Sequence, residues 1–189
     1  KVSEEEVVLG GNLALEVELT PVCYNLSAAV APQDAGSVEF SPAPNCEGGR
    51  YYDGTEVTIT ATAHSRFAFT GWSGDASGGS PSVAITMDGG KSAIANFIGC
   101  CSLDTDIEPP GSGTIAVSPA PNCDGGFYID GTVVALAATP NSDFIFDRWS
   151  GDVGGTNQTV SVTLDADKSV CANMASEPTA IFLPAIAGS

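Results

Sequence analysis

The hexapeptide Ser-Pro-Ala-Pro-Asn-Cys occurs twice in this chain, at residues 41–46 and again at residues 118–123. The offset between these copies is 77 positions, and the same offset aligns residues 23–97 with residues 100–174 without a gap. An ungapped register of this length marks a tandem duplication in which each copy is one structural unit. The sequence therefore predicts two equivalent small modules rather than one domain of 189 residues.

This register sorts four of the six cysteines. Cys23 aligns with Cys100 and Cys46 aligns with Cys123, so symmetry favours one disulfide within each copy, Cys23 with Cys46 and Cys100 with Cys123. Small β modules often need such staples because their cores are thin. Oxidised cysteines in turn indicate an extracellular or cell-surface location. Six reduced thiols in a cytosolic protein are the alternative.

The other two cysteines, Cys101 and Cys171, occur only in the second copy, where the first copy has Tyr24 and Ile94. Neighbouring residues of a strand point to opposite faces, so Cys100 and Cys101 need different partners. We therefore expect a third disulfide between Cys101 and Cys171, which would tie the first strand of the copy to its last. A bond between Cys100 and Cys171 would instead break the symmetry.

Alternation of apolar and polar residues predicts short strands in each copy, about one every ten residues. Leu26, Ala28 and Val30 alternate at the start of the first copy, and the aligned residues of the second copy repeat the pattern. Asp-Gly at 53–54 predicts a type I′ hairpin, whereas the prolines of the repeated hexapeptide are expected to leave the sheet. No segment shows a convincing helical pattern longer than about two turns. The predicted fold class is all-β.

Longer motifs shared by the copies resemble a known family. Each copy contains Tyr-x-x-Gly-Thr-x-Val, then Phe-x-Phe-x-x-Trp-Ser-Gly-Asp, then a segment that begins Lys-Ser. The matching segments are 51–57, 67–75 and 91–97 in the first copy and 128–134, 144–152 and 168–174 in the second. This order is similar to the divergent internalin-type B-repeat family of bacterial surface proteins. The resemblance implies small β-grasp-like modules that serve as spacers, adhesins or appendages, with no catalytic residues to carry over.

Together, the repeat and the resemblance predict two tandem β-grasp-like or β-sandwich repeat modules with intramodule disulfides. The expected parts are a strand-like extension at 1–22, modules at 23–99 and 100–174, and an apolar tail at 175–189. Both end segments contain apolar residues that are expected to dock on the chain's own modules or on a neighbour. These candidate assembly residues are Leu13, Leu15, Val17, Ile181, Phe182 and Leu183.

Charge argues against two classes of partner. The chain has 23 acidic and 6 basic residues, for a formal net charge of −17, and the bases are scattered singly. Binding to a nucleic acid backbone needs several Lys or Arg on one face, so neither nucleic acid nor an anionic membrane surface is an expected partner. No run approaches the roughly 18 apolar residues of a membrane span.

Catalytic and metal-binding residues are not expected. His64 is the only histidine and aligns with Asn141, and no Cys-x-x-Cys pair is present, so neither zinc nor another cofactor is predicted. No Gly-x-Ser-x-Gly element surrounds a nucleophile. A carboxylate pair for glycoside hydrolysis is compatible with spacing alone, but no acid lies inside an apolar segment, where its pKa would be raised.

Several repeated residues have both a structural and a functional interpretation. Trp72 and Trp149 are expected to close the core of each copy rather than to stack on sugars. Asp75 and Asp152 are expected to bond to the backbone in an Asx-type turn rather than to bind calcium. Two Asn-x-Ser/Thr sequons mark candidate glycosylation sites. They begin at Asn25 and Asn157.

Three functions fit these observations. The first is a non-enzymatic extracellular spacer or adhesion module, whose partners are other surface proteins. The second is a subunit of an extracellular filament or pilus, in which terminal segments add as strands to neighbouring copies. The third is a carbohydrate-binding appendage that uses exposed aromatic residues. These aromatic residues are Tyr51, Tyr52 and Tyr128.

Overall fold

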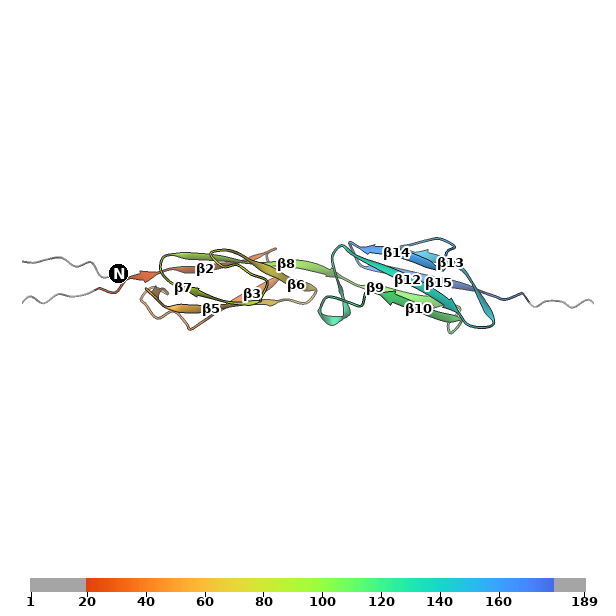
Figure 1. Ribbon diagram of the computed structural model, residues 1–189, viewed down its shortest axis with the longest axis horizontal. Coiled ribbons are helices and arrows are strands. Elements are labelled where there is room, and N and C mark those ends of the chain that lie inside the picture. The colour runs from red at the N-terminus through yellow and green to blue at the C-terminus, as the bar shows by residue number, and fades with distance from the viewer. Residues whose placement is uncertain (1–19, 179–189) are drawn as a thin grey trace, which may run out of the picture. The chain divides into compact units, whose positions relative to one another are not determined.

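The computed structural model describes residues 20–178, which form two compact units that divide between Gly99 and Cys100 (Figure 1). In this part of the chain the only helical element is one short 3₁₀ turn, so the predicted all-β fold class is confirmed. All six candidate assembly residues at the two ends lie outside the described residues: Leu13, Leu15, Val17, Ile181, Phe182 and Leu183.

Unit 1 is built from two three-stranded sheets and a small ribbon. Its strands are β1 (Cys23–Tyr24), β2 (Leu26–Ala31), β3 (Gly36–Ser41), β4 (Tyr51–Tyr52), β5 (Glu56–Ala63), β6 (Phe67–Gly74), β7 (Ser82–Thr86) and β8 (Lys91–Cys101). One sheet has the order β2-β8-β6, with β2 parallel and β6 antiparallel to β8; the other is antiparallel, in the order β3-β5-β7. β1 and β4 form the ribbon.

Unit 2 repeats this topology. Its strands are β9 (Leu103–Glu108), β10 (Gly113–Ser118), β11 (Tyr128–Ile129), β12 (Thr132–Pro140), β13 (Phe144–Gly151), β14 (Thr159–Leu164) and β15 (Lys168–Ser176), and the 3₁₀ turn η1 is Asp124–Gly126. The sheets are β9-β15-β13 and β10-β12-β14, and the ribbon of this unit is β11 paired with the last two residues of β8. β2 pairs in parallel with β8 and β9 with β15, as in a β-grasp sheet, and the second sheet makes each unit a sandwich. β15 runs two residues past position 174, where the aligned copies end.

Alternation along the strands places one core between the two sheets of each unit. The inward residues of β5 and β8 are buried in unit 1: Val57, Ile59, Ala61, Ala93, Ala95 and Phe97. The aligned residues of β12 and β15 are buried in unit 2: Val134, Leu136, Ala138, Val170, Ala172 and Met174. Small alanines of the last strand therefore face larger branched side chains of the opposite sheet, which lets the two layers interdigitate.

The hairpin predicted at Asp53-Gly54 is wrong. β4 pairs with β1 and β5 pairs with β3 and β7, so the strands on either side of this turn do not pair with each other. Only Gly54 has a positive φ, of 77°, whereas a type I′ turn needs two such residues. The turn instead carries the chain from the ribbon into the second sheet.

Candidate functional site

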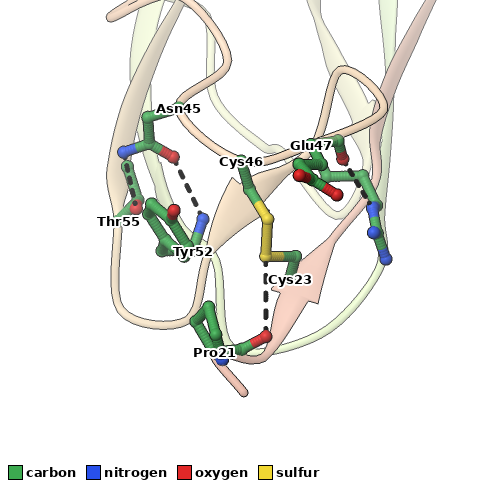
Figure 2. Close-up of a disulfide and its surroundings, with 8 residues drawn as sticks. Pro21, Cys23, Asn45, Cys46, Glu47, Tyr52 and Thr55 are labelled. Atoms are coloured by element: carbon green, nitrogen blue, oxygen red, sulfur yellow. Dashed lines mark hydrogen bonds between the residues drawn. A yellow bond between two sulfur atoms is a disulfide. The ribbon is translucent and has the colours of Figure 1, made fainter. Parts of the chain in front are cut away.

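The repeated hexapeptide forms a clamped loop beside the ribbon in each unit. In unit 1 Cys46 is bonded to Cys23 of β1, with their Cα atoms 6.3 Å apart (Figure 2). Asn45 holds the same loop, because its Oδ1 accepts from the Tyr52 backbone N–H at 3.1 Å and its Nδ2 donates to Thr55 Oγ1 at 3.4 Å. The loop is thereby tied to both strands of the ribbon.

Unit 2 has the same clamp. Cys100 and Cys123 are bonded with a Cα separation of 6.4 Å. Asn122 accepts from the Ile129 N–H at 2.8 Å and donates to Thr132 Oγ1 at 3.3 Å. Both intramodule disulfides predicted from the repeat register are therefore confirmed.

The third predicted disulfide, between Cys101 and Cys171, is wrong. β15 pairs with β9 in parallel, which places Lys168 opposite Leu103 and Cys171 opposite Asp106. Cys101 precedes Leu103 by two residues and Cys171 follows Lys168 by three. The two cysteines are thus five positions apart along the strand direction, roughly 16 Å at about 3.3 Å per residue. A disulfide needs Cα atoms closer than about 7 Å.

Two of the three tyrosines expected to be exposed are buried. Tyr51 is 1% exposed and Tyr128 is 3% exposed, because each points from the ribbon toward the core. Their hydroxyl groups donate to the carbonyl oxygens of Pro42 and Pro119, at 3.1 and 3.4 Å, and burial raises the pKa of both phenols. Of the three, only Tyr52 faces solvent, at 41% exposed, so the expected exposure of Tyr51 and Tyr128 for sugar binding is wrong.

The two tryptophans close the cores, as expected. Trp72 is 6% exposed and Trp149 is 2% exposed. Their indole N–H groups donate to the carbonyl oxygens of Ser80 and Asn157, at 3.0 and 2.9 Å. A buried indole with its polar edge satisfied stabilises the fold and leaves no ring face for a ligand.

The Trp-Ser-Gly-Asp element clamps two strands of the same sheet. Asp75 Oδ2 accepts from the Ser92 N–H at 2.7 Å, and the Asp75 N–H donates back to the Ser92 carbonyl at 2.8 Å. Asp152 and Ser169 form the same pair, at 2.7 and 2.9 Å. The expected bond to the backbone is confirmed, but its partner lies 17 residues away, not within a local turn. Within residues 20–178, no three acidic, histidine or cysteine side chains gather as a metal site.

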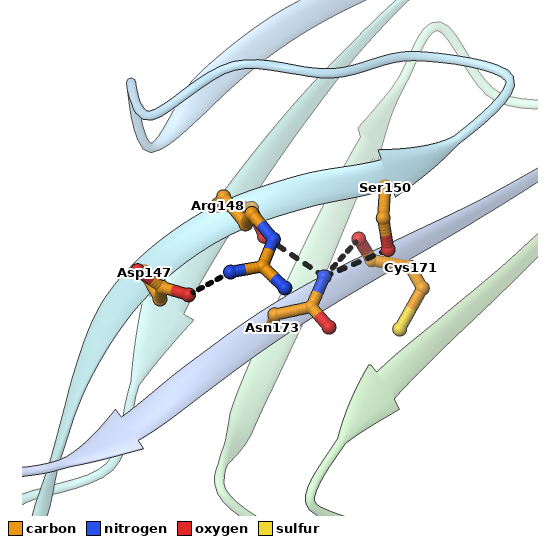
Figure 3. Close-up of polar contacts among 5 residues, drawn as sticks. All are labelled: Asp147, Arg148, Ser150, Cys171 and Asn173. Carbon is orange, nitrogen blue, oxygen red and sulfur yellow. Dashed lines mark hydrogen bonds and ion pairs between the residues drawn. The ribbon is translucent and has the colours of Figure 1, made fainter.

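A further pair of repeated residues, missed in the sequence, supports a β-bulge. The pairing of β13 with β15 shifts between Phe146 and Arg148. Asn173 Nδ2 donates there to the Arg148 carbonyl at 3.2 Å and to Ser150 Oγ at 2.8 Å (Figure 3). Asn96 does the same at the bulge of β6. The sequence signal that could have identified Asn96 and Asn173 is that both copies have asparagine at this aligned position.

The exposed charges include one ion pair that recurs in both units. Lys91 lies 2.6 Å from Asp88, and Lys168 lies 2.8 Å from Asp165. The hydrogen bond to the lysine lowers the pKa of each aspartate, and the same bond raises the pKa of each lysine. Both aspartates are exposed at the turn before the last strand, where an ion pair contributes little to stability.

The two candidate glycosylation residues, Asn25 and Asn157, are exposed. Both offer their backbone carbonyls to structural bonds, from the Lys91 N–H at 2.9 Å and from the Trp149 indole at 2.9 Å. Glycosylation at either residue stays a prediction.

The clearest difference between the units lies on one edge strand. β2 and β9 are aligned by the repeat, and among residues 20–178 each is the edge strand of its sheet, in parallel pairing with the last strand of its unit. The outward residues of β9 are acidic: Asp104, Asp106 and Glu108. The aligned residues of β2 are uncharged: Ser27, Ala29 and Ala31. Outward charge on an edge strand protects it from pairing with another chain, so only β9 carries that protection.

The Asp106 side chain also accepts a hydrogen bond from a backbone N–H group on the open edge of β9. In a parallel ladder alternate residues turn their N–H and C=O toward the partner strand, and the bond from Lys168 N–H to Ser102 C=O, at 3.0 Å, assigns the even-numbered residues of β9 to β15. Ile107 therefore faces the open edge. Its N–H donates to Asp106 Oδ1 at 2.9 Å, which caps the edge with the chain's own carboxylate.

Alternate residues of β2 face its open edge in the same way, but within the described part of the chain no side chain accepts from their N–H groups as Asp106 does in β9. The bond from Lys91 N–H to Asn25 C=O, at 2.9 Å, assigns residues 25, 27, 29 and 31 to β8. Leu26, Ala28 and Val30 then present one N–H and one C=O each to the open edge. The residue before Val30 is an alanine, which has no side-chain acceptor.

Two tandem β-sandwich units, each with its own disulfide and the same internal clamps, define a β-repeat protein. The chain belongs to the family of divergent InlB B-repeat domains, whose profile matches it twice, over residues 26–99 and 103–178. No curated protein matches the chain. Among residues 20–178, no helix has the length and apolar character needed to cross a membrane.

Proposed function

We propose that this chain is a non-enzymatic structural part of an extracellular surface protein, where its two units act as spacer and adhesion modules. The family supports a surface repeat protein. The observation that carries the proposal is the use of the repeated polar residues: Asn45, Asp75 and Asn96 each bond within their own unit, as do their counterparts. Residues repeated for a shared chemistry would converge on a cleft, whereas these hold strands and loops.

An extracellular location agrees with the disulfides and with the charge. Bonds such as Cys23–Cys46 persist in oxidising compartments. A net charge of −17 favours solubility outside the cell.

Immunogold microscopy of the producing cells, with an antibody against the purified chain, tests this proposal. We expect label outside the cell boundary. Non-reducing mass spectrometry of the native protein provides the second measurement and should find both disulfides. Label confined to the cytosol with reduced cysteines would overturn the proposal.

A filament subunit is the second candidate, and the end segments favour it. Leu13, Leu15 and Val17 alternate with polar or small residues, and Ile181, Phe182 and Leu183 form an apolar run. Segments of this kind add to open sheet edges of other chains in β-strand addition. Electron microscopy of the purified full-length chain tests it, because polymers are expected and a field of dispersed particles would exclude assembly.

A further inference from the structure

We propose that the open edge of β2 is the acceptor for residues 13–19 of a second copy of this chain, an inference that rests on the filament role. Three backbone residues of β2, Leu26, Ala28 and Val30, face that edge with their N–H and C=O groups. Unpaired edge groups of this kind are a template for an added strand.

The charge pattern selects β2 over its counterpart β9. Residues 13–19 read Leu-Ala-Leu-Glu-Val-Glu-Leu, an order that in a strand would put the leucines and the valine on one face and Glu16 and Glu18 on the other. Beside β2 these glutamates would lie next to Ser27 and Ala29, which carry no charge. Beside β9 they would meet an acidic row, and like charges on adjacent strands destabilise pairing. The cap from Asp106 to Ile107 closes β9 further.

The apolar face of the segment also fits. Leu26 and Val30 point inward but are only partly buried at the sheet edge. The apolar side chains of residues 13, 15 and 17 would extend that layer. The segment has seven residues against the six of β2, so as a strand it would be long enough to cover the whole edge. The C-terminal segment fits less well, because its apolar residues are contiguous and Pro184 has no N–H to donate.

We assign the donor to a second copy because the residues between the segment and β2 offer no favourable position for a tight reversal. Cys23 and Tyr24 are paired with β4, and the Val22 carbonyl accepts from the Asp53 N–H at 2.9 Å. A tight reversal would have to use Thr20-Pro21. Primed hairpin turns need a positive φ that proline cannot adopt and that a β-branched residue disfavours. Each copy then offers one donor and one acceptor, which makes the contact head-to-tail.

A complementation experiment with full-length chains tests this contact. The acceptor variant combines Ser27→Asp with Ala29→Asp, which copies the acids that β9 carries. The donor variant combines Leu15→Glu with Val17→Glu. We expect concentration-dependent polymers of the parent chain in analytical ultracentrifugation, loss of at least roughly tenfold in association for each variant alone, and dimers that grow no further when the two variants are mixed.

A matched control separates this edge from the others. Ala84 is an exposed, uncharged residue of β7, an edge strand of the other sheet, so Ala84→Asp should leave assembly unchanged. Polymers that survive in the acceptor variant, or that are lost in Ala84→Asp, would overturn the inference while the filament role stands. A parent chain that stays monomeric at every concentration overturns both, and the extracellular label described above is independent of either result. Loss of assembly on Ile181→Glu with Leu183→Glu alone would assign the donor to the C-terminal segment.

Discussion

Unit 1 and unit 2 share the polar bonds that hold their strands and loops, and they differ in the outward residues of one edge strand. The Asn that holds the disulfide loop, the Asp that ties two strands and the Asn at the bulge make the same bonds in both units, within a few tenths of an ångström. The outward residues of β2 and β9, by contrast, differ at all three positions. The same polar bonds therefore hold strands and loops in both units, and the edge strand is free to be closed in one unit and open in the other.

The disulfides offer the largest effect with which to test this equivalence. Each closes a loop with a sequence separation of 23 residues. Removing either pair, as Cys23→Ala with Cys46→Ala or as Cys100→Ala with Cys123→Ala, should lower the free energy of unfolding of its unit by about 3 kcal/mol, because the unfolded loop gains the same entropy.

Each unit contains one of the chain's two tryptophans, so fluorescence can report on one unit at a time. Urea unfolding of unit 1 is followed by Trp72 in a Trp149→Phe background, and unit 2 by Trp149 in a Trp72→Phe background. Losses that differ between the pairs by more than about 1 kcal/mol would show that the two clamps are not equivalent.

Symmetry explains why these two disulfides were predictable and the third was not. The repeat fixes the partners of cysteines that occur in both copies, but Cys101 and Cys171 have no counterparts to compare. Their separation depends on the parallel pairing of β9 with β15, which sets Cys171 opposite Asp106. That pairing joins strands at opposite ends of the module, and alternation along one strand carries no information about it.

The tyrosines show again that alternation along one strand does not predict every contact. The strands, the core tryptophans and the inward faces of β5 and β12 follow from period-two alternation, which the sequence displays directly. Tyr51 and Tyr52 form a strand of only two residues, too short for a pattern to indicate which one points inward. Tyr51 is the one that points inward, because the Pro42 carbonyl in the hexapeptide loop accepts a hydrogen bond from its hydroxyl.

A second comparison concerns the first glycine of two aligned strands, Gly36 of β3 and Gly113 of β10. A Cβ added at Gly36 would lie 2.5 Å from the Thr62 carbonyl and 2.6 Å from Phe97 Cζ. At Gly113 it would lie 2.6 Å from the Thr139 carbonyl and 3.0 Å from Met174 Cε.

Gly36→Ala should therefore cost about 2 kcal/mol of unfolding free energy and Gly113→Ala about 1 kcal/mol, because a methionine methyl can move and a phenyl ring cannot. Gly89→Ala is the control, since a Cβ there meets nothing within 4 Å. The same urea experiment measures all three variants. Equal losses at Gly36 and Gly113 would show that the carbonyl contact alone sets the penalty.

The third comparison is a pair of fully buried residues, Ala35 in unit 1 and Ser112 in unit 2. The Ser112 hydroxyl has no hydrogen-bond partner among the described residues, and a buried hydroxyl without one is destabilising. Ser112→Ala should raise the unfolding free energy of unit 2 by about 1 kcal/mol, and Ala35→Ser should lower that of unit 1 by about as much. Destabilisation by Ser112→Ala would mean that the hydroxyl finds a partner in solution.

The smallest expected change in unfolding free energy lies in the turn that joins β2 to β3 in unit 1 and β9 to β10 in unit 2. Asp34 adopts a φ of 67° in unit 1, where unit 2 has Gly111 with a φ of 79°. The carbonyl of this turn residue accepts from the next connection in both units, from His64 Nδ1 at 2.8 Å and from Asn141 Nδ2 at 2.7 Å. These contacts keep the left-handed conformation in place whichever residue occupies it.

Asp34→Gly should therefore relieve backbone strain without changing the turn. The gain is partly offset by the greater entropy of glycine in the unfolded chain, which leaves about 0.5 kcal/mol of stabilisation. Gly111→Asp should cost unit 2 a similar amount, because its turn has the same conformation and the same bonded carbonyl. Thermal and urea unfolding of the two variants measure the pair. Opposite changes of equal size would show that the turns are interchangeable, whereas a loss in both would mean that the Asp34 side chain stabilises unit 1 in a way that its backbone conformation does not reveal.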